Sequence, residues 1–229
     1  TPIIVERAMY LTGQGRFFNA GHESAGVTAP ATTWFLAEGN TGSYFDLFVL
    51  LANPNDQGAD ARVTYLLPGG ATYTRTMTVP ANSRQNIWVD YDTPDGTTGQ
   101  PLADTAVSTT VEVTNGVPIV VERAMWWPVG PGQWFEAHNS AGATATGTVW
   151  ALAEGEAGGP ASHETYILLA NTSAFAGEAR VTIVFEDGAT AVKTFALSPT
   201  SRTNVAVGYE FPEAAGIVDR SLFAAAGAA

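Results

Sequence analysis

The chain has 229 residues, of which 45% are hydrophobic and only 14% are charged, and its formal net charge is −12. This acidic balance argues against nucleic acid as a partner, because binding it requires a basic surface, and no apolar run approaches the roughly 20 residues of a membrane span. The absence of cysteine excludes disulfides, zinc–thiolate sites and a cysteine nucleophile.

The N-terminal segment, residues 2–10, reads PIIVERAMY and returns 116 residues later as PIVVERAMW at residues 118–126. A match of this quality at a fixed offset predicts a duplicated chain. Residues 2–10 are rich in β-branched side chains, which predicts a strand. Because both faces of this strand are largely apolar, we expect it in the interior of a β-sandwich.

Residues 11–33 are rich in glycine and are expected to form a connection that belongs to the module. It contains Phe17-Phe18 and the run HESAG at 22–26, which correspond to Trp134-Phe135 and HNSAG at 138–142. The runs WFLAEG and WALAEG follow, again at an offset of 116. Beyond them the offset grows to 118, as expected for an insertion in a surface turn.

The remaining strands are expected at corresponding places in the two copies. They are residues 44–52, 61–65, 73–79, 85–91 and 106–114 in the first copy, and residues 163–170, 179–183, 191–197 and 203–209 in the second. Short strands separated by turn signals predict antiparallel β-sandwiches with about seven strands each. Residues 221–229 reach the equivalent of 106–114, so the second copy is expected to lack a final strand.

The predicted fold is therefore all-β, with two tandem duplicated antiparallel β-sandwich modules. Residues 1–29 form a strand and connection from a preceding or shared module, residues 30–127 the first complete module, and residues 128–229 a connection and a second, incomplete module. The strand at 2–10 then lacks a module, and an uncovered strand edge needs a partner. It could close the second module in the same chain, complete that of a neighbouring chain by strand donation, or belong to a longer tandem array.

Several motifs in this order resemble a known repeat. They are GHESAG at 21–26, WFLAEG at 34–39, LANP at 51–54, VPANSR at 79–84, VST at 107–109 and VERAM at 121–125. The succession is similar to a tandem β-rich repeat, a domain of unknown function, in secreted and cell-surface proteins of high-GC Gram-positive and related bacteria. The resemblance implies an extracellular module and implies no catalytic residue.

The repeated charged residues are the first candidates for chemistry. They are Glu6, Arg7, Glu38, Glu122, Arg123 and Glu154. Neighbours on a strand point to opposite faces, so each arginine is expected to meet a carboxylate elsewhere, with Glu38 and Glu154 as the candidates. Two carboxylates across a cleft would serve a glycosidase, but two small sandwiches offer little cleft. No enzyme and no catalytic residue are predicted, and His22 and His138 are expected to cap turns.

A Gly-terminated loop carries three carboxylates, Asp90, Asp92 and Asp95. Oxygen ligands of this kind suit a hard cation such as Ca²⁺, although the spacing does not follow the EF-hand pattern. The alternative is a solvated acidic turn. No other cofactor is expected.

Aromatic residues gather around the second copy of the VERAM motif at Trp126, Trp127, Trp134 and Phe135. Such residues on the rim of a sandwich can stack on sugar rings, or they can seal the end of the sandwich. We therefore expect a non-catalytic extracellular structural or interaction module that contacts neighbouring copies of itself, assembling end to end through residues 2–10. The alternative is a carbohydrate-binding module whose partner is a cell-wall or extracellular glycan.

Overall fold

The computed structural model describes residues 1–13, 16–130, 133–214 and 223–228. Nearly all of its regular structure is antiparallel β, which confirms the predicted all-β sandwich fold. The chain divides into two compact units, residues 1–67 with 72–145 and residues 68–71 with 146–229. Residues 1–29 and 128–145 thus go with the first unit, which differs from the predicted boundaries. Among the described residues, no helix has the length and apolar character needed to cross a bilayer.

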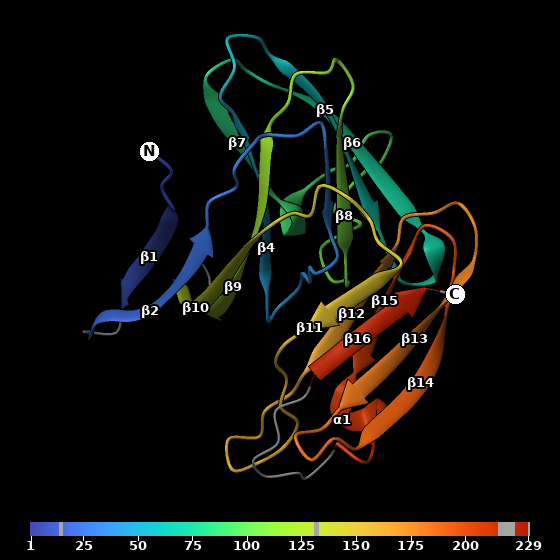
Figure 1. Cartoon of the computed structure of the whole chain (residues 1–229). Coiled ribbons are helices and arrows are strands. Elements are labelled where there is room, and N and C mark those ends of the chain that lie inside the picture. The colour runs from blue at the N-terminus through green and yellow to red at the C-terminus, as the bar shows by residue number, and fades with distance from the viewer. Residues whose placement is uncertain (14–15, 131–132, 215–222, 229) are drawn as a thin grey trace. The chain divides into compact units, whose positions relative to one another are not determined.

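The first unit is built on two four-stranded sheets (Figure 1). One sheet has the order β3 (Thr33–Leu36), β8 (Ser108–Val113), β5 (Ala59–Leu66) and β6 (Thr72–Val79). The other has the order β10 (Gln133–Ala141), β9 (Val120–Gly130), β4 (Asp46–Asn53) and β7 (Ser83–Trp88). This unit also contains the short 3-10 turn η2 (Val89–Tyr91), whereas the 3-10 turn η1 (Pro68–Gly70) is grouped with the second unit.

Alternation along the strands explains the core of this unit. In β4 the side chains of Leu47, Val49 and Leu51 are buried, while the residues between them face outward. Successive side chains of a strand point to opposite faces, so each strand gives one face to the space between the sheets. Trp34 and Tyr65 are the largest fully buried side chains there.

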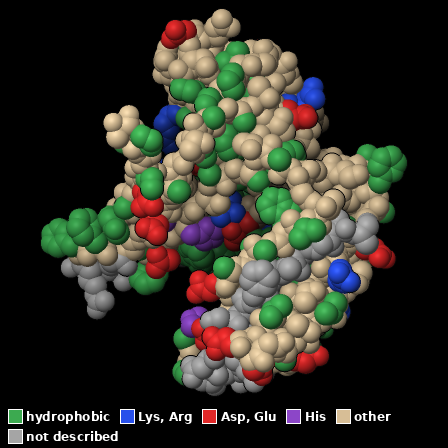
Figure 2. Space-filling view, viewed as in Figure 1, with side chains coloured by type: hydrophobic (Ala, Val, Ile, Leu, Met, Phe, Trp, Pro, Cys, Tyr) green, Lys and Arg blue, Asp and Glu red, His purple; other side chains and the backbone are tan. Residues whose placement is uncertain are grey.

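A separate hairpin precedes the first sandwich and consists of β1 (Glu6–Gly13) and β2 (Arg16–Ala25). The strand predicted at 2–10 thus begins at Glu6, and the predicted connection over 11–33 contains a second strand. Residues 1–10 are exposed throughout, so the expected interior position is wrong for the chain by itself. The reason is that β1 pairs with β2 alone among the described residues. Figure 2 shows hydrophobic side chains gathered on this hairpin, at the left of the view.

The four-stranded sheet of the second unit has the same strand order as the β3–β8–β5–β6 sheet of the first unit. That sheet runs β11 (Val149–Leu152), β16 (Phe223–Ala228), β13 (Gly177–Val184) and β14 (Thr190–Leu197). Its other sheet has only β12 (Tyr166–Asn171) and β15 (Ser201–Ala206) among the described residues. A helical turn, α1 (Val207–Glu210), stands where the sequence predicts the end of a strand.

The pairing registers of the two units correspond residue by residue. Phe48 faces Trp88 where β4 pairs with β7, and Tyr166 faces Ala206 where β12 pairs with β15, at the predicted offset of 118. The units differ at one place in sheet order. On its other edge β4 pairs with β9, whereas no described strand pairs with the second edge of β12.

Candidate functional site

The second unit has both a free edge on β12 and exposed aromatic and aliphatic side chains on β11. Trp34 is 1% exposed and Leu36 is 5% exposed on β3 of the first unit. Their counterparts on β11, Trp150 and Leu152, are 50% and 46% exposed. The sequence positions are equivalent, so the difference comes from a covering element that the first unit has and the described part of the second unit lacks.

Hydrogen bonds identify that covering element as the segment that leads into β9. The Trp34 Nε1–H donates to the carbonyl oxygens of Ala31, at 3.2 Å, and Ile119, at 2.9 Å. The Trp150 Nε1–H donates to the Gly147 carbonyl at 3.0 Å, which is the counterpart of the first of these bonds. The second acceptor, at Ile119, lies just before β9. By the repeat offset, its equivalent is Ile3, which lies just before β1.

The β9–β10 hairpin also carries a buried ion pair. Arg123 Nη1 lies 2.6 Å from Glu38 Oε2, and the Arg123 side chain is only 7% exposed. His138 joins the pair, with its Nε2 3.5 Å from Glu38 Oε1 and its Nδ1 3.1 Å from Arg123 Nη2. Burial lowers the pKa of Arg123, while Glu38 opposes this shift. Glu38 is one of the two carboxylates named as candidate partners for the arginines, and His138 is part of this cluster rather than the cap of a turn.

In the second unit the equivalent carboxylate, Glu154, is exposed, and no hydrogen bond or ion pair joins it to another described residue. The equivalents of Arg123 and His138 are Arg7 and His22, and both lie on the hairpin β1–β2. The residues equivalent to the Glu38–Arg123–His138 cluster are thus divided: Glu154 follows β11, whereas Arg7 and His22 lie on the hairpin β1–β2. Glu6, the neighbour of Arg7, is exposed on β1.

Arg7 and His22 instead contact the outer face of the β9–β4 sheet in their own unit. Arg7 Nη1 lies 2.7 Å from Glu122 Oε2, in a pair whose side chains are 42% and 19% exposed. The His22 ring packs edge-on against Trp126 at 5.6 Å between centroids. Both His22 ring nitrogens are buried without a hydrogen-bond partner among the described residues. Burial, followed by the charge of Arg7, lowers the pKa of His22.

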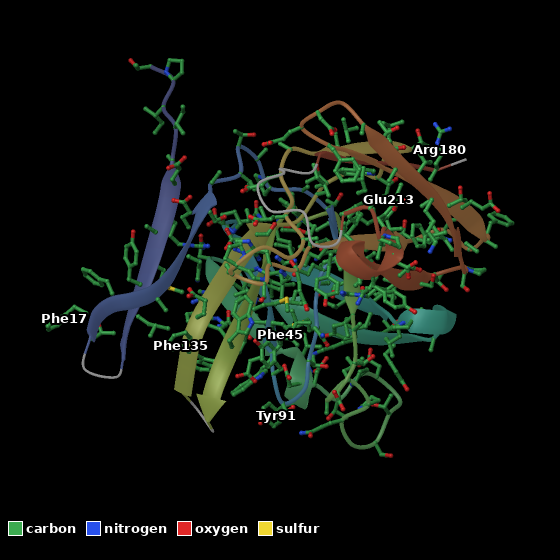
Figure 3. All side chains as sticks on the ribbon, turned by 90° about the horizontal axis from the view of Figure 1, so that it is seen from below. Phe17, Phe45, Tyr91, Phe135, Arg180 and Glu213 are labelled. Carbon is green, nitrogen blue, oxygen red and sulfur yellow. The ribbon has the colours of Figure 1, made fainter. Side chains whose placement is uncertain are left out.

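Between the hairpin and this outer face lies a groove of about 490 Å³. Its walls include Phe48, Trp126 and Trp134 on the sheet, together with Arg84 and Asn86 on β7. Trp126 and Trp134 were predicted as a ligand or packing cluster, and their ring centroids are 5.4 Å apart. Figure 3 shows Phe17 at the far end of the hairpin, away from this sheet.

The other two predicted aromatics do not line the groove. Trp127 packs against Phe45 and against His138, each with ring centroids 5.2 Å apart. This is the sealing role that the sequence left open as the alternative to sugar stacking. Phe135 is 46% exposed on β10, and Figure 3 shows it on that strand.

The three carboxylates considered for Ca²⁺ take separate protein donors. Asp90 accepts the backbone N–H groups of Gly42 and Leu47, at 3.0 and 2.9 Å. Asp92 accepts the Tyr65 hydroxyl at 2.7 Å and pairs with Arg75. Asp95 accepts the backbone N–H and the hydroxyl of Thr76, at 2.8 and 2.7 Å. Among the described residues, no group of three acidic or histidine side chains is placed to hold a metal ion. Burial raises the pKa of Asp90 to about 6, against the effect of its two backbone donors.

Asp46, Phe48 and Trp88 were not singled out as site residues from the sequence. Asp46 accepts the indole N–H groups of Trp88, at 3.2 Å, and Trp134, at 2.5 Å. One signal was present, because β4 carries apolar residues at outward as well as inward positions. A sheet face exposed to solvent usually alternates with polar residues instead.

The sequence matches no protein-family model, and no curated protein matches it. Two solved structures are similar in part. Thermotoga maritima 1070 has 17% identity over 52% of this chain and 99% of its own, with a TM-score of 0.42. The sensory rhodopsin transducer of Anabaena has 24% identity over 43% of this chain and 91% of its own, with a TM-score of 0.36. Likeness at this level carries no argument about function.

Proposed function

We propose that this chain is a non-catalytic assembly module, in which the β1–β2 hairpin of one copy completes the second sandwich of a neighbouring copy. The observation that carries the proposal is the contrast between buried Trp34 and Leu36 and half-exposed Trp150 and Leu152. In the first unit, the hairpin β9–β10 and the segment before it cover these positions. The same chain displays a second hairpin of related sequence, in which Met9, Tyr10, Phe17 and Phe18 are exposed.

The register of the first unit specifies how the donated strand pairs. Val49 faces Arg123 and Leu51 faces Val121 where β4 pairs with β9. Transferred by the repeat offsets, Ile167 faces Arg7 and Leu169 faces Val5 of the donor. The edge of β1 that pairs in this way is the one that β2 leaves free. Addition of a strand to an open edge satisfies the backbone groups of both strands.

Side-chain chemistry matches this register at three points. Arg7 takes the place of Arg123 and reaches Glu154, which has no ion pair among the described residues. His22 takes the place of His138, so its Nε2 gains the same carboxylate and its Nδ1 gains Arg7, where neither nitrogen has a hydrogen-bond partner among the described residues of the free chain. The Ile3 carbonyl accepts the second hydrogen bond from the Trp150 indole. In the free chain, Arg7, Glu154 and Ile3 are exposed and the His22 ring nitrogens have no hydrogen-bond partner among the described residues.

Each copy donates one hairpin and receives one, so the contact is heterologous and propagates into a filament unless a ring closes. Assembly of this kind suits a structural element at the cell surface. The extracellular location itself rests on the sequence resemblance.

Two substitutions at adjacent positions test the proposal. Val5 corresponds to Val121, which is fully buried, whereas Ile4 corresponds to Val120, which faces the other side and is partly exposed. Both Val5 and Ile4 are exposed in the chain by itself, at 60% and 91%. Val5→Asp therefore leaves each copy folded but places a carboxylate in the completed core, which costs several kcal/mol. Ile4→Asp is the matched control.

Sedimentation velocity and light scattering over a wide concentration range give the readout. The wild type and Ile4→Asp are expected to associate as concentration rises, and Val5→Asp is expected to stay monomeric. A wild type that remains a monomer at the highest concentrations, or two variants that associate equally, would overturn the proposal.

A further inference from the structure

The outer face of the β9–β4 sheet carries an aromatic platform that a solvent-facing sheet does not need. It consists of Phe48, Trp88, Trp126 and Trp134, all partly exposed. The ring centroids of Phe48 and Trp88 are 5.1 Å apart, and those of Trp88 and Trp134 are 6.2 Å apart. The four rings thus form one continuous surface along the four neighbouring strands of this sheet. Three of them line the groove, and Trp88 extends the platform beyond it.

The carboxylate of Asp46 holds two of these rings in place. It accepts both indole N–H groups, one on each oxygen, so neither Trp88 nor Trp134 requires another hydrogen-bond partner. The polar atoms of both indoles are directed into the protein. Rings fixed in this way are preorganised for contact through their apolar surfaces.

Polar side chains lie beside the platform in the same groove. Asn86 Oδ1 accepts a hydrogen bond from Arg84 Nη2 at 2.8 Å, which orients both groups on β7. Asn139 reaches Glu122 through its Nδ2 at 3.4 Å, and its Oδ1 is buried without a partner among the described residues. The groove therefore combines an apolar floor with amide and guanidinium groups, the arrangement typical of small-molecule sites.

Comparison with the second unit argues against a packing role that both units share. Arg84 and Asn86 correspond to Arg202 and Asn204, which form the same type of hydrogen bond at 2.8 Å. Trp88 instead corresponds to Ala206, at the same place in the register. The fold is therefore compatible with alanine at this position, and the indole belongs to the first unit alone.

We propose that this groove binds a short oligosaccharide. A pyranose ring has apolar C–H faces, which stack on aromatic rings, and a rim of hydroxyl groups, which bond to amides and guanidinium groups. The volume of about 490 Å³ lies within the range of about 300–1,000 Å³ that small-molecule sites occupy. This site is separate from the open edge of β12, and because the hairpin β1–β2 forms one wall of the groove, the inference concerns the unassembled chain.

Tryptophan fluorescence and calorimetric titration with cellohexaose, xylohexaose and chitohexaose test the proposal. The variants are Trp134→Ala, which removes an indole that lines the groove, and Asn86→Ala, which removes a polar contact from an outward-facing strand position. Trp150→Ala is the matched control, because it removes a half-exposed indole from the second unit. Circular dichroism melting confirms that each variant is folded, and all titrations are repeated in the Val5→Asp background.

At least one of the three sugars is expected to bind saturably, with the dissociation constant raised about tenfold or more in Trp134→Ala and Asn86→Ala and unchanged in Trp150→Ala. The proposal is overturned if none of the sugars binds saturably at millimolar concentration. It is equally overturned if Trp134→Ala binds like the wild type, or if Trp150→Ala loses as much affinity as Trp134→Ala.

Discussion

Replacing Glu154 with glutamine should weaken association of the chains while leaving the stability of the free chain nearly unchanged. Glu154 is exposed in the chain by itself, so Glu154→Gln should change the free energy of unfolding by no more than about 0.5 kcal/mol. In the assembly, Arg7 enters the environment that Arg123 has in the first unit. There the arginine side chain is 7% exposed and lies 2.6 Å from its carboxylate.

The magnitude follows from that geometry. Removing one partner of a buried ion pair costs about 3–5 kcal/mol. Glu38 keeps 32% of its side chain exposed, and this solvent screening reduces the expected cost to about 2–3 kcal/mol. Association of the Glu154→Gln variant should therefore weaken by about 30- to 150-fold. Glu38→Gln calibrates the value, because there the same loss is measured as a lower free energy of unfolding.

Sedimentation equilibrium of the wild type and of the Glu154→Gln and Glu122→Gln variants supplies the measurement. Glu122 is the partner of Arg7 in the free chain, so Glu122→Gln releases the hairpin and should leave association unchanged or make it tighter. The reasoning fails if Glu154→Gln associates as tightly as the wild type. It also fails if Glu122→Gln is the more weakly associating variant.

Three further predictions concern the first unit. The pKa of His22 lies below its usual value while the hairpin contacts Trp126, so His22 binds a proton more readily once that contact is broken. The contact should therefore weaken as pH falls below about 6.5. An NMR titration in which the contact persists to pH 5 would contradict this. The pKa of Asp90 shifts in the opposite direction, because burial raises it in the folded state to about 6. The contribution of Asp90 to the free energy of unfolding, measured in urea, should therefore fall as pH rises from about 4 to above 6. The Asp90→Asn variant should lack this pH dependence. Gly39→Ala should destabilise the unit by about 1–3 kcal/mol, because a Cβ there would lie 2.7 Å from the Val107 carbonyl oxygen; Gly177→Ala, where a Cβ meets nothing within 4 Å, should melt like the wild type.

Local patterns were sufficient to predict the β character and most strands. Period-two alternation of apolar residues marks a strand wherever it occurs, and turn residues mark its ends. The recurrence of motifs at a fixed offset also marked Arg123 and Glu38 as candidates for ion pairing, because each belongs to a segment that occurs twice in the chain. The ion pair between them is present at 2.6 Å.

One local prediction was wrong where two signals competed. The glycines between 11 and 33 predicted a connection, but residues 16–25 form β2, because pairing with β1 satisfies their backbone groups. The grouping of Asp90, Asp92 and Asp95 suggested a shared ligand. Each carboxylate instead takes donors from a different part of the unit, such as Leu47, Tyr65 and Thr76.

The sequence by itself determined that the chain makes antiparallel strands in a recurring order, because hydrophobic alternation and turn chemistry are properties of neighbouring residues. Only the tertiary structure decided that β12 keeps a free edge, that Trp150 is half exposed where Trp34 is buried, and that Asp46 joins Trp88 to Trp134. These features depend on which strand lies beside which. That choice is made by contacts between residues far apart in the chain, and alternation along a strand shows which side chains share a face but not what the face meets.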